Sequence, residues 1–247
     1  MLGNERQNEI MNYIRLHGSA SVQKLTSLVF ASEATIRRDL NQLEQMGLVR
    51  RVFGGATLAI RADTQIPLFV REQEESEEKL EICRKASEFI KDGSVLFIDG
   101  SSTCQHLIPY LSKFKELIVI TNGLKIAMML YELRIKTYCT GGKLLEGSSV
   151  FIGKDTQAVI DRFNTDICFI SSKGIDLSGK ISDTSEEEVE LRRHALNNSR
   201  TRILLLTGKK IGTSYLHKLC DSTELDTIIT STILPESIKT KEPFVIS

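Results

Sequence analysis

The feature that most constrains the fold is an alternation of short apolar segments with helical segments after Gly93. Six apolar segments are interpreted as buried strands, because they are nearly continuously apolar and rich in β-branched residues: 94–99, 116–121, 135–140, 166–171, 202–207 and 225–230. Between most of them lie stretches with helical periodicity, at 102–114, 123–133, 153–163 and 184–199. In the second of these stretches, Met128, Met129 and Leu130 are predicted to be helix core. This alternation predicts an α/β domain with a parallel sheet covered by helices on both faces.

Polar residues gather where these predicted strands end, which is where parallel sheets bind their ligands. Five strands end in small, hydroxyl or basic residues, among them Asp99, Gly100, Ser101, Ser102, Thr103, Thr121, Asn122, Gly141, Gly142, Lys173, Gly174 and Lys210. Any one end is weak evidence, because Gly and Ser commonly terminate strands. Five together, with lysines at two of them, predict a polar pocket for a phosphorylated small molecule.

The first 58 residues show a different pattern. Two helical segments, 5–18 and 21–30, precede a third at 32–43, and the segment 48–58 is predicted to be a two-stranded hairpin with Gly54 and Gly55 in its turn. Two short helices, a tight turn and a polar-faced third helix are typical of a helix-turn-helix, and the hairpin would be the wing of a winged helix.

The third helix of this unit carries an apolar stripe and a polar face. Ile36, Leu40 and Leu43 recur at helical spacing and are predicted to face the core. Ser32 can cap the helix, and side chains on the exposed side and flank are candidates for DNA contact: Thr35 and Arg38 for bases, Arg37 for phosphate. Arg50 and Arg51 would contact the DNA backbone or minor groove from the wing. Taken alone, a solvated helix face would explain the same pattern.

Charge and cysteine content narrow the class further. The chain has 247 residues and no net formal charge, yet residues 1–61 hold eight basic and five acidic residues, as expected of a DNA-binding head. Five dispersed cysteines without a CxxC pair argue against a zinc site or a disulfide framework. The histidines have no partners at metal-ligand spacing, so neither a metal nor a cofactor is expected. No signal peptide or membrane-spanning run is apparent, and a cytoplasmic location is expected.

The run SEATIRRDLNQLEQMGLVRRVFGGA, residues 32–56, resembles the signature of the DeoR family of bacterial sugar-metabolism repressors. Phe53 stands where family members often carry histidine. The second part of the chain resembles the DeoR sensor domain, which is similar in fold to ribose-5-phosphate isomerase and glucosamine-6-phosphate deaminase. The matching pieces are IDGSST, VITNGL, TGG, a following Gly153, KGID and a Glu-Glu pair before a helix.

This resemblance implies roles for particular residues. Ser101, Ser102 and Thr103 would hold the phosphate, with Lys210 reaching towards it. The sugar would be surrounded by Asp99, Thr121, Asn122, Lys173 and Glu187. Thr207 and Gly208 depart from the Asp or His with Ser that is common in the family, which suggests a different effector preference.

We therefore expect a winged helix-turn-helix at 1–58 (helix-turn-helix about 21–40), a linker at 59–78 and a phosphosugar-sensing α/β domain at 79–247. The expected function is repression of a carbohydrate-metabolism operon, with release from a double-stranded DNA operator by a phosphorylated sugar, in a homo-oligomer (dimer or tetramer). Two alternatives remain open at this point. One is a sugar-phosphate isomerase-like enzyme, which needs a carboxylate base over the sugar. The other is a DNA-binding protein whose C-terminal domain only oligomerises, in which case no phosphosugar would change its melting temperature.

Overall fold

The computed structural model describes residues 3–58, 68–145 and 147–245. The chain divides into two compact units, Met1–Glu74 and Glu75–Ser247, which we describe separately. Residues 59–67 of the predicted linker lie outside the described residues.

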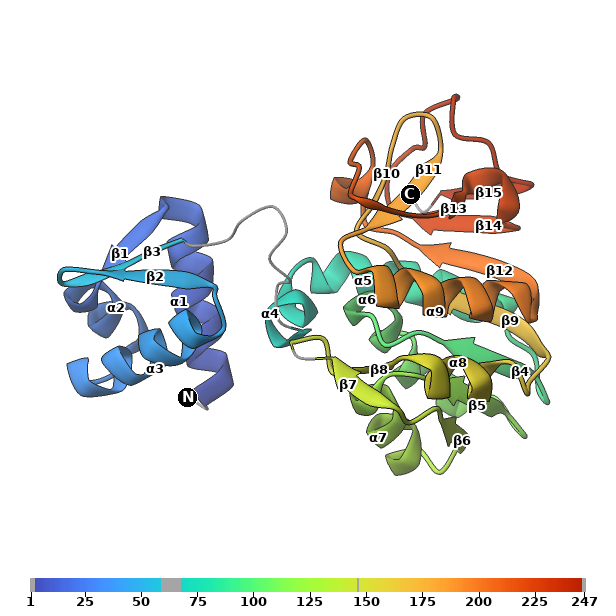
Figure 1. Cartoon of the computed structure of the whole chain (residues 1–247), viewed down its shortest axis with the longest axis horizontal. Coiled ribbons are helices and arrows are strands. Elements are labelled where there is room, and N and C mark those ends of the chain that lie inside the picture. The colour runs from blue at the N-terminus through green and yellow to red at the C-terminus, as the bar shows by residue number, and fades with distance from the viewer. Residues whose placement is uncertain (1–2, 59–67, 146, 246–247) are drawn as a thin grey trace. The chain divides into compact units, whose positions relative to one another are not determined.

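The first unit consists of helices and a small sheet (Figure 1). Its helices are α1 (Gly3–His17), α2 (Val22–Val29), α3 (Glu33–Gln45) and the short α4 (Leu68–Gln73). The predicted wing is present as β2 (Val49–Val52) and β3 (Gly55–Leu58). It is larger than predicted, because β1 (Ser19–Ser21) pairs with β3 and makes a three-stranded antiparallel sheet of order β1-β3-β2.

The apolar stripe of α3 is the centre of this unit's core. Ile36, Leu40 and Leu43 are fully buried and pack with residues of α1 and α2. Asp39, on one flank of α3, is also buried. Arg6 of α1 donates to its carboxylate from Nε at 2.5 Å and from Nη2 at 3.1 Å. This ion pair fixes α1 against α3.

The second unit contains a seven-stranded sheet in which every pair of neighbours is parallel, as predicted (Figure 1). In spatial order its strands are β15 (Glu242–Val245), β14 (Thr227–Thr230), β12 (Ser199–Leu205), β9 (Thr165–Ile170), β4 (Val95–Ile98), β5 (Ile118–Thr121) and β6 (Lys136–Cys139). Smaller antiparallel sheets, which the sequence did not predict, are formed by β10 (Gly174–Ile175), β11 (Lys180–Asp183) and β13 (His217–Asp221), and by β7 (Lys143–Leu145) and β8 (Val150–Ile152).

Helices cover both faces of the large sheet (Figure 1). On one face lie α5 (Ser76–Ala86), α6 (Ser102–Gln105) and α7 (Leu124–Glu132); on the other lie α8 (Lys154–Ile160) and α9 (Glu186–Asn197). Successive residues of β4 enter different cores: Leu96 and Ile98 face α5–α7, whereas Phe97 faces α8 and α9. Burial on both faces explains the continuously apolar strands.

Three local predictions were wrong. The helix expected at 102–114 is α6 followed by 3-10 turns at Ile108–Lys113, where Pro109 lies at the start of the second segment. The segment around β6 was predicted to be a buried strand, but β6 lies at the edge of the sheet and is mostly exposed. Met128, predicted to be in the core, is exposed on α7.

Candidate DNA interface and effector site

The start of α3 is organised by its cap. Ser32 has extended backbone angles, and its Oγ accepts a hydrogen bond from the backbone N–H of Thr35 at 3.3 Å. The two hydroxyl oxygens of Ser32 and Thr35 lie 2.9 Å apart. Ser32 is therefore the N-cap predicted from sequence, and the pair places two hydroxyls at the helix N-terminus, where a phosphate or base edge can be bound.

The four arginines predicted to contact DNA differ in whether their side chains already have a partner inside the domain; they are Arg37, Arg38, Arg50 and Arg51. Arg38 and Arg50 are exposed, and their side chains make no hydrogen bond or ion pair within the described residues. Arg37 is exposed but pairs with Glu33 one turn earlier, at 3.2 Å. Two of the predicted DNA contacts are thus available without breaking an internal bond.

Arg51 is used inside the domain. Its guanidinium donates to Asn41 Oδ1 at 2.5 Å, to the carbonyl of Arg37 at 3.4 Å and to the carbonyl of Gly55 at 3.3 Å. Its backbone N–H donates to the carboxylate of Glu44 at 2.7 Å. Arg51 therefore connects the wing to α3, so that the two elements present their polar residues together.

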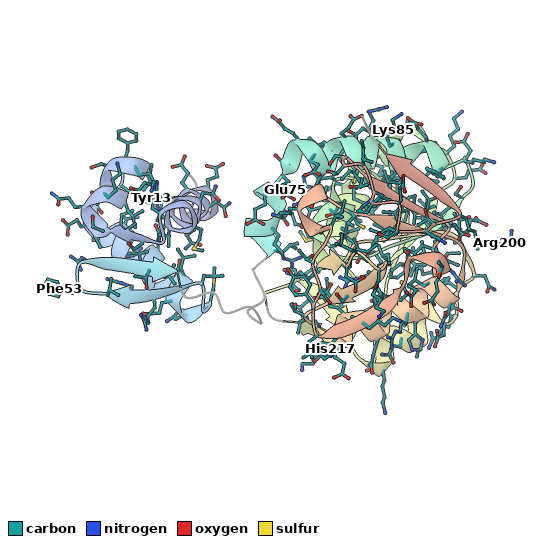
Figure 2. The ribbon with its side chains drawn as sticks, turned by 90° about the horizontal axis from the view of Figure 1, so that it is seen from above. Tyr13, Phe53, Glu75, Lys85, Arg200 and His217 are labelled. Atoms are coloured by element: carbon teal, nitrogen blue, oxygen red, sulfur yellow. The ribbon has the colours of Figure 1, made fainter. Side chains whose placement is uncertain are left out.

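The turn of the wing needs both of its glycines. Gly54 has φ of +75°, which favours glycine, and its carbonyl accepts from the N–H of Val22 at 2.8 Å. A Cβ on Gly55 would lie 2.2 Å from the carbonyl oxygen of Ala20, so β3 could not approach β1. Phe53 stands fully exposed at this turn (Figure 2).

In the second unit the strand order reverses at β4. The chain runs from β4 outward to β5 and β6, then returns to β9 on the other side of β4. The carboxyl ends of β4 and β9 therefore form the topological switch point at which α/β sheets bind ligands. Asp99–Thr103 follow β4 and Ser171–Lys173 follow β9, so the sequence-predicted residues are concentrated at this switch point.

The loops after β4 and β5 are fastened to one another. The N–H of Gly100 donates to Asn122 Oδ1 at 2.9 Å, and Asn122 Nδ2 donates to the carbonyl of Phe151 at 3.3 Å. A Cβ on Gly100 would meet the Cα of Gly123 at 2.9 Å, so the loops approach as closely as backbone permits. Thr121 Oγ1 donates to the carbonyl of Ile98 at 2.7 Å.

Hydroxyl groups and one lysine converge beside this contact. Ser101 caps α6 by accepting from the N–H of Cys104 at 3.2 Å. Ser171 Oγ lies 3.4 Å from Thr103 Oγ1, and Lys210 Nζ donates to Ser171 Oγ at 3.1 Å. Ser102 is buried in the same turn. The ends of β4, β9 and the loop after β12 thus contribute to a single polar cluster.

Two further hydroxyls at strand ends have no partner. Thr140 Oγ1, after β6, and Thr207 Oγ1, after β12, are buried and accept or donate no hydrogen bond within the described residues. Buried polar atoms are normally hydrogen-bonded, so an unpaired one calls for a water or a ligand.

A buried charge cluster lies beneath the site and was not predicted. Arg192 of α9 donates to Asp99 Oδ2 at 2.7 Å, to Asp183 Oδ2 at 2.9 Å and to Glu188 Oε2 at 2.6 Å. Glu188 also accepts from Ser148 at 3.1 Å. Burial is the largest single influence on Asp99 and favours its neutral form. The charge of Arg192 and the hydrogen bonds from Ser101, Cys104 and Arg192 together outweigh it and hold the pKa of Asp99 below its usual value. The only sequence signal for this cluster was the helical spacing of Glu188 and Arg192.

Asp99 is therefore turned towards α9, with its other oxygen accepting from the N–H of Ser101 at 3.1 Å. Other predicted effector residues lie apart from the hydroxyl cluster. Gly141 and Gly142 lie between β6 and β7, and Thr156 Oγ1 of α8 donates to the carbonyl of Gly141 at 2.7 Å. Glu187 is exposed in the first turn of α9. Lys173 is half-buried and Gly174 begins β10, directly after the end of β9.

The loop after β12 is held by the first turn of α5. Glu78 Oε1 accepts from the N–H of Gly208 at 2.7 Å and from the hydroxyl of Ser231. Glu75 Oε1 pairs with Lys209 Nζ at 2.8 Å. Both carboxylates belong to the segment at which the second unit begins, so the loop that carries Lys210 is bonded to the entry of the chain into this unit.

Within the described ranges, no group of three or more His, Cys, Asp or Glu side chains is arranged to hold a metal ion. None of the helices described is long and apolar enough to cross a membrane.

Two family models match the chain, each over one of its units. Residues 6–61 match the DeoR-like helix-turn-helix domain, and residues 74–232 match the DeoR C terminal sensor domain. Among curated proteins, the chain is 31% identical to the uncharacterized HTH-type transcriptional regulator YulB of Bacillus subtilis, over 98% of this chain and 94% of that protein. It is 30% identical to the glycerol-3-phosphate regulon repressor of Escherichia coli, over 95% of this chain and 93% of that protein.

Among solved structures, ribose 5-phosphate isomerase A from Methanocaldococcus jannaschii is similar to part of the chain. It is 14% identical, with a TM-score of 0.43, over 56% of this chain and 55% of that one.

Proposed function

The chain belongs to the DeoR family of transcriptional regulators, and on this premise we propose that it represses a carbohydrate-metabolism operon and leaves its operator when it binds a phosphorylated sugar. The observation that carries the effector half of the proposal is the cluster at the switch point of the sheet. There Thr103, Ser171 and Lys210 are joined by hydrogen bonds at the ends of strands that are distant in sequence.

In the head, Thr35 and Arg38 read bases in the major groove. Arg38 is suited to this because its guanidinium is exposed and can bond the O6 and N7 atoms of a guanine together. Ser32, Arg37 and Arg50 contact phosphates, which adds affinity without base preference. Arg51, with Gly54 and Gly55, holds the wing against α3, and its contribution to DNA binding is largely to position the wing.

In the sensor, Ser101, Ser102, Thr103 and Lys210 bind the phosphate, and the hydroxyl of Thr207 is satisfied by the ligand. A phosphate group accepts hydrogen bonds readily, which matches a cluster of hydroxyl donors beside one ammonium group. The sugar lies towards Thr121, Asn122, Gly141, Gly142, Lys173, Gly174 and Glu187. Asp99 shapes this site through the N–H of Ser101 and through Arg192 rather than by binding the sugar.

The effector signal leaves the site through the loop after β12. When Lys210 turns to the phosphate, Gly208 and Lys209 move with it because they are its neighbours in the chain. These two residues are the ones bonded to Glu78 and Glu75, so the start of α5 responds. The expected coupling between effector and operator is about 1–3 kcal/mol, or roughly 5- to 150-fold in affinity.

The same geometry argues against the isomerase-like alternative. A general base works best when its pKa lies near the operating pH. Asp99 and Asp183 are both bonded to Arg192, and the pKa of Asp99 is lowered. Hydrogen bonds from Ser178 and Lys180 lower the pKa of Asp176 as well. A carboxylate with a lowered pKa is a weak base, which argues against Asp99 and Asp176 as the general base, and we propose that the chain is not an enzyme.

We further propose that the protein acts in the cytoplasm, as a homo-oligomer, with residues 1–58 as the DNA-binding domain, 59–78 as the linker and 79–247 as the sensor. The test is fluorescence anisotropy on the DNA upstream of the protein's own operon, at fixed salt because affinity for DNA depends steeply on ionic strength. We expect tight binding that one of a panel of phosphorylated sugars releases. If the protein binds this DNA tightly but no sugar phosphate changes the affinity, the proposed DNA binding stands and the proposed effector site is wrong.

A further inference from the structure

Exposed apolar side chains in the described part of the chain gather at one edge of the second unit. Of the fourteen large apolar residues that are exposed, six lie between residues 124 and 144: Leu124, Met128, Tyr131, Leu133, Tyr138 and Leu144. They come from α7 and the residue that follows it, and from β6 and β7; these elements lie together at the lower end of this unit in Figure 1. A concentration of this kind marks an interaction surface rather than ordinary exposure.

The centre of this surface is a second apolar face on α7. Ile126 and Leu130 point into the core beneath the sheet-covering helices. Leu124, Met128 and Tyr131, at i, i+4 and i+7, form a stripe on another side, and Tyr131 is 81% exposed. A helix that is apolar on more than one side is typical of a helix covered on more than one side. The described residues of the chain cover only the first.

We propose that α7 is the self-association surface of this protein, packed antiparallel against α7 of a second copy. Lys125 and Glu132 are exposed beside the stripe, seven residues apart, and Met128 lies midway between them. A two-fold axis near Met128 places Lys125 of one protomer against Glu132 of the partner subunit, and the same pair forms again on the other side of the axis. In this arrangement the apolar stripe contacts the same stripe of the partner, and each positive charge faces a negative one. The surface is thus complementary to itself, as a two-fold interface requires.

The edge of the sheet supports the same occupant. The strand β6 pairs with β5 on one side, and no described strand pairs with its other side. An edge left open is a site for association with another chain. Because β6 packs beside α7, an α7 pair would bring two β6 edges close together and cover Tyr138. A helix-turn-helix protein that reads two half-sites also requires a two-fold partner.

The first test is the molar mass of the full chain in solution without DNA, by analytical ultracentrifugation over a range of concentrations. We expect the wild type to associate, and Met128→Glu to weaken association about a hundredfold, because it places two uncompensated charges in the interface. The matched control is Leu177→Glu, since Leu177 and Met128 are both 59% exposed and Leu177 lies outside this surface. A monomeric wild type, or equal association of Met128→Glu and the wild type, would overturn the proposal.

The second test addresses the antiparallel geometry. Lys125→Glu and Glu132→Lys should each weaken association, because each places like charges opposite one another. The double variant should recover association to near the wild-type level, since the reversed pair is again complementary. A double variant as weak as, or weaker than, the singles would refute the arrangement. This inference rests on the homo-oligomer of the proposed function and names its interface. A monomeric wild type would reject that homo-oligomer, whereas unchanged association of Met128→Glu would reject only the α7 interface. Neither measurement uses operator or effector, so neither tests repression.

Discussion

Replacing Glu78 with alanine should uncouple effector binding from DNA binding while leaving each site intact. The carboxylate of Glu78 accepts the N–H of Gly208 at 2.7 Å and the hydroxyl of Ser231, and no other side chain joins α5 to both segments within the described residues. Neither Glu78 nor Gly208 is among the residues proposed to contact the phosphate or the operator. The substitution therefore removes the connection and not the ligands.

The magnitude follows from the bonds that are lost. A hydrogen bond to a charged group contributes about 1.5–3 kcal/mol, and leaving a buried donor without an acceptor costs about 1–3 kcal/mol. Either value is as large as the whole coupling free energy of about 1–3 kcal/mol. The effector-induced change in operator affinity should therefore fall to within about threefold of unity. Operator affinity without effector should change by less than the coupling itself.

The assay is anisotropy of labelled operator DNA, titrated with protein in the absence and presence of saturating effector, at one salt concentration. Glu81→Ala is the matched control, because Glu81 lies one turn further along α5 and pairs with Arg84 at 2.7 Å on the exposed surface. Effector affinity and the free energy of unfolding are measured for both variants. If Glu78→Ala keeps the wild-type response to effector, the route through the loop after β12 is wrong.

Three further predictions follow from named contacts. Arg38→Ala should weaken operator binding by about 1–3 kcal/mol and relax the base preference at one position of the operator. Arg50→Ala should weaken binding evenly across DNA sequences and lower the slope of log affinity against log salt concentration by about one. An Arg38→Ala variant that loses equal affinity for operator and random DNA would contradict the base-reading role. Ser102→Asp should abolish the effector response, measured by anisotropy, with DNA binding unchanged, because a buried carboxylate repels a phosphate; an undiminished response would rule out the phosphate loop. Arg192→Met should lower the free energy of unfolding at pH 7 by about 3–5 kcal/mol, because it strands buried carboxylates. The pKa of Asp99 is depressed in the wild type, so this stabilisation is present above the ordinary pKa of an aspartate, about 4, and is lost as the pH falls below it. Urea unfolding of both proteins between pH 3 and 7 tests the loss of stability and its pH dependence. A variant as stable as the wild type at pH 7 would contradict the prediction.

Much of this architecture could be predicted from local patterns. The apolar runs that became β4, β5, β9, β12 and β14 are buried on both faces of the sheet, and that burial is what made them continuously apolar. The cap at Ser32 and the glycines of the wing are local devices, and the structure has them as predicted. The run around β6 was misleading, because one face and one edge of that strand lie open where an interaction with another chain is proposed.

Contacts between distant residues could not be predicted in this way. The family resemblance assigned Asp99 to the sugar, and no local pattern predicted that Arg192, 93 residues later, would donate to one of its oxygens. Asp39 lies on a flank of α3, and no local pattern predicted that Arg6 of α1 pairs with it. In each case one charged residue has ordinary helical or strand-end surroundings in the sequence, and its partner is brought to it only by packing.

The sequence by itself determined the class of each unit, the position of α3 and the strand ends at which a ligand is proposed to bind, because hydrophobic period, caps and turn residues act over a few neighbours. The tertiary structure decided which of those strand ends meet, which carboxylates are neutralised by Arg192, and that the loop carrying Lys210 is bonded to the first turn of α5. Those outcomes depend on strand order and on the reversal at β4, which join residues that no local pattern relates.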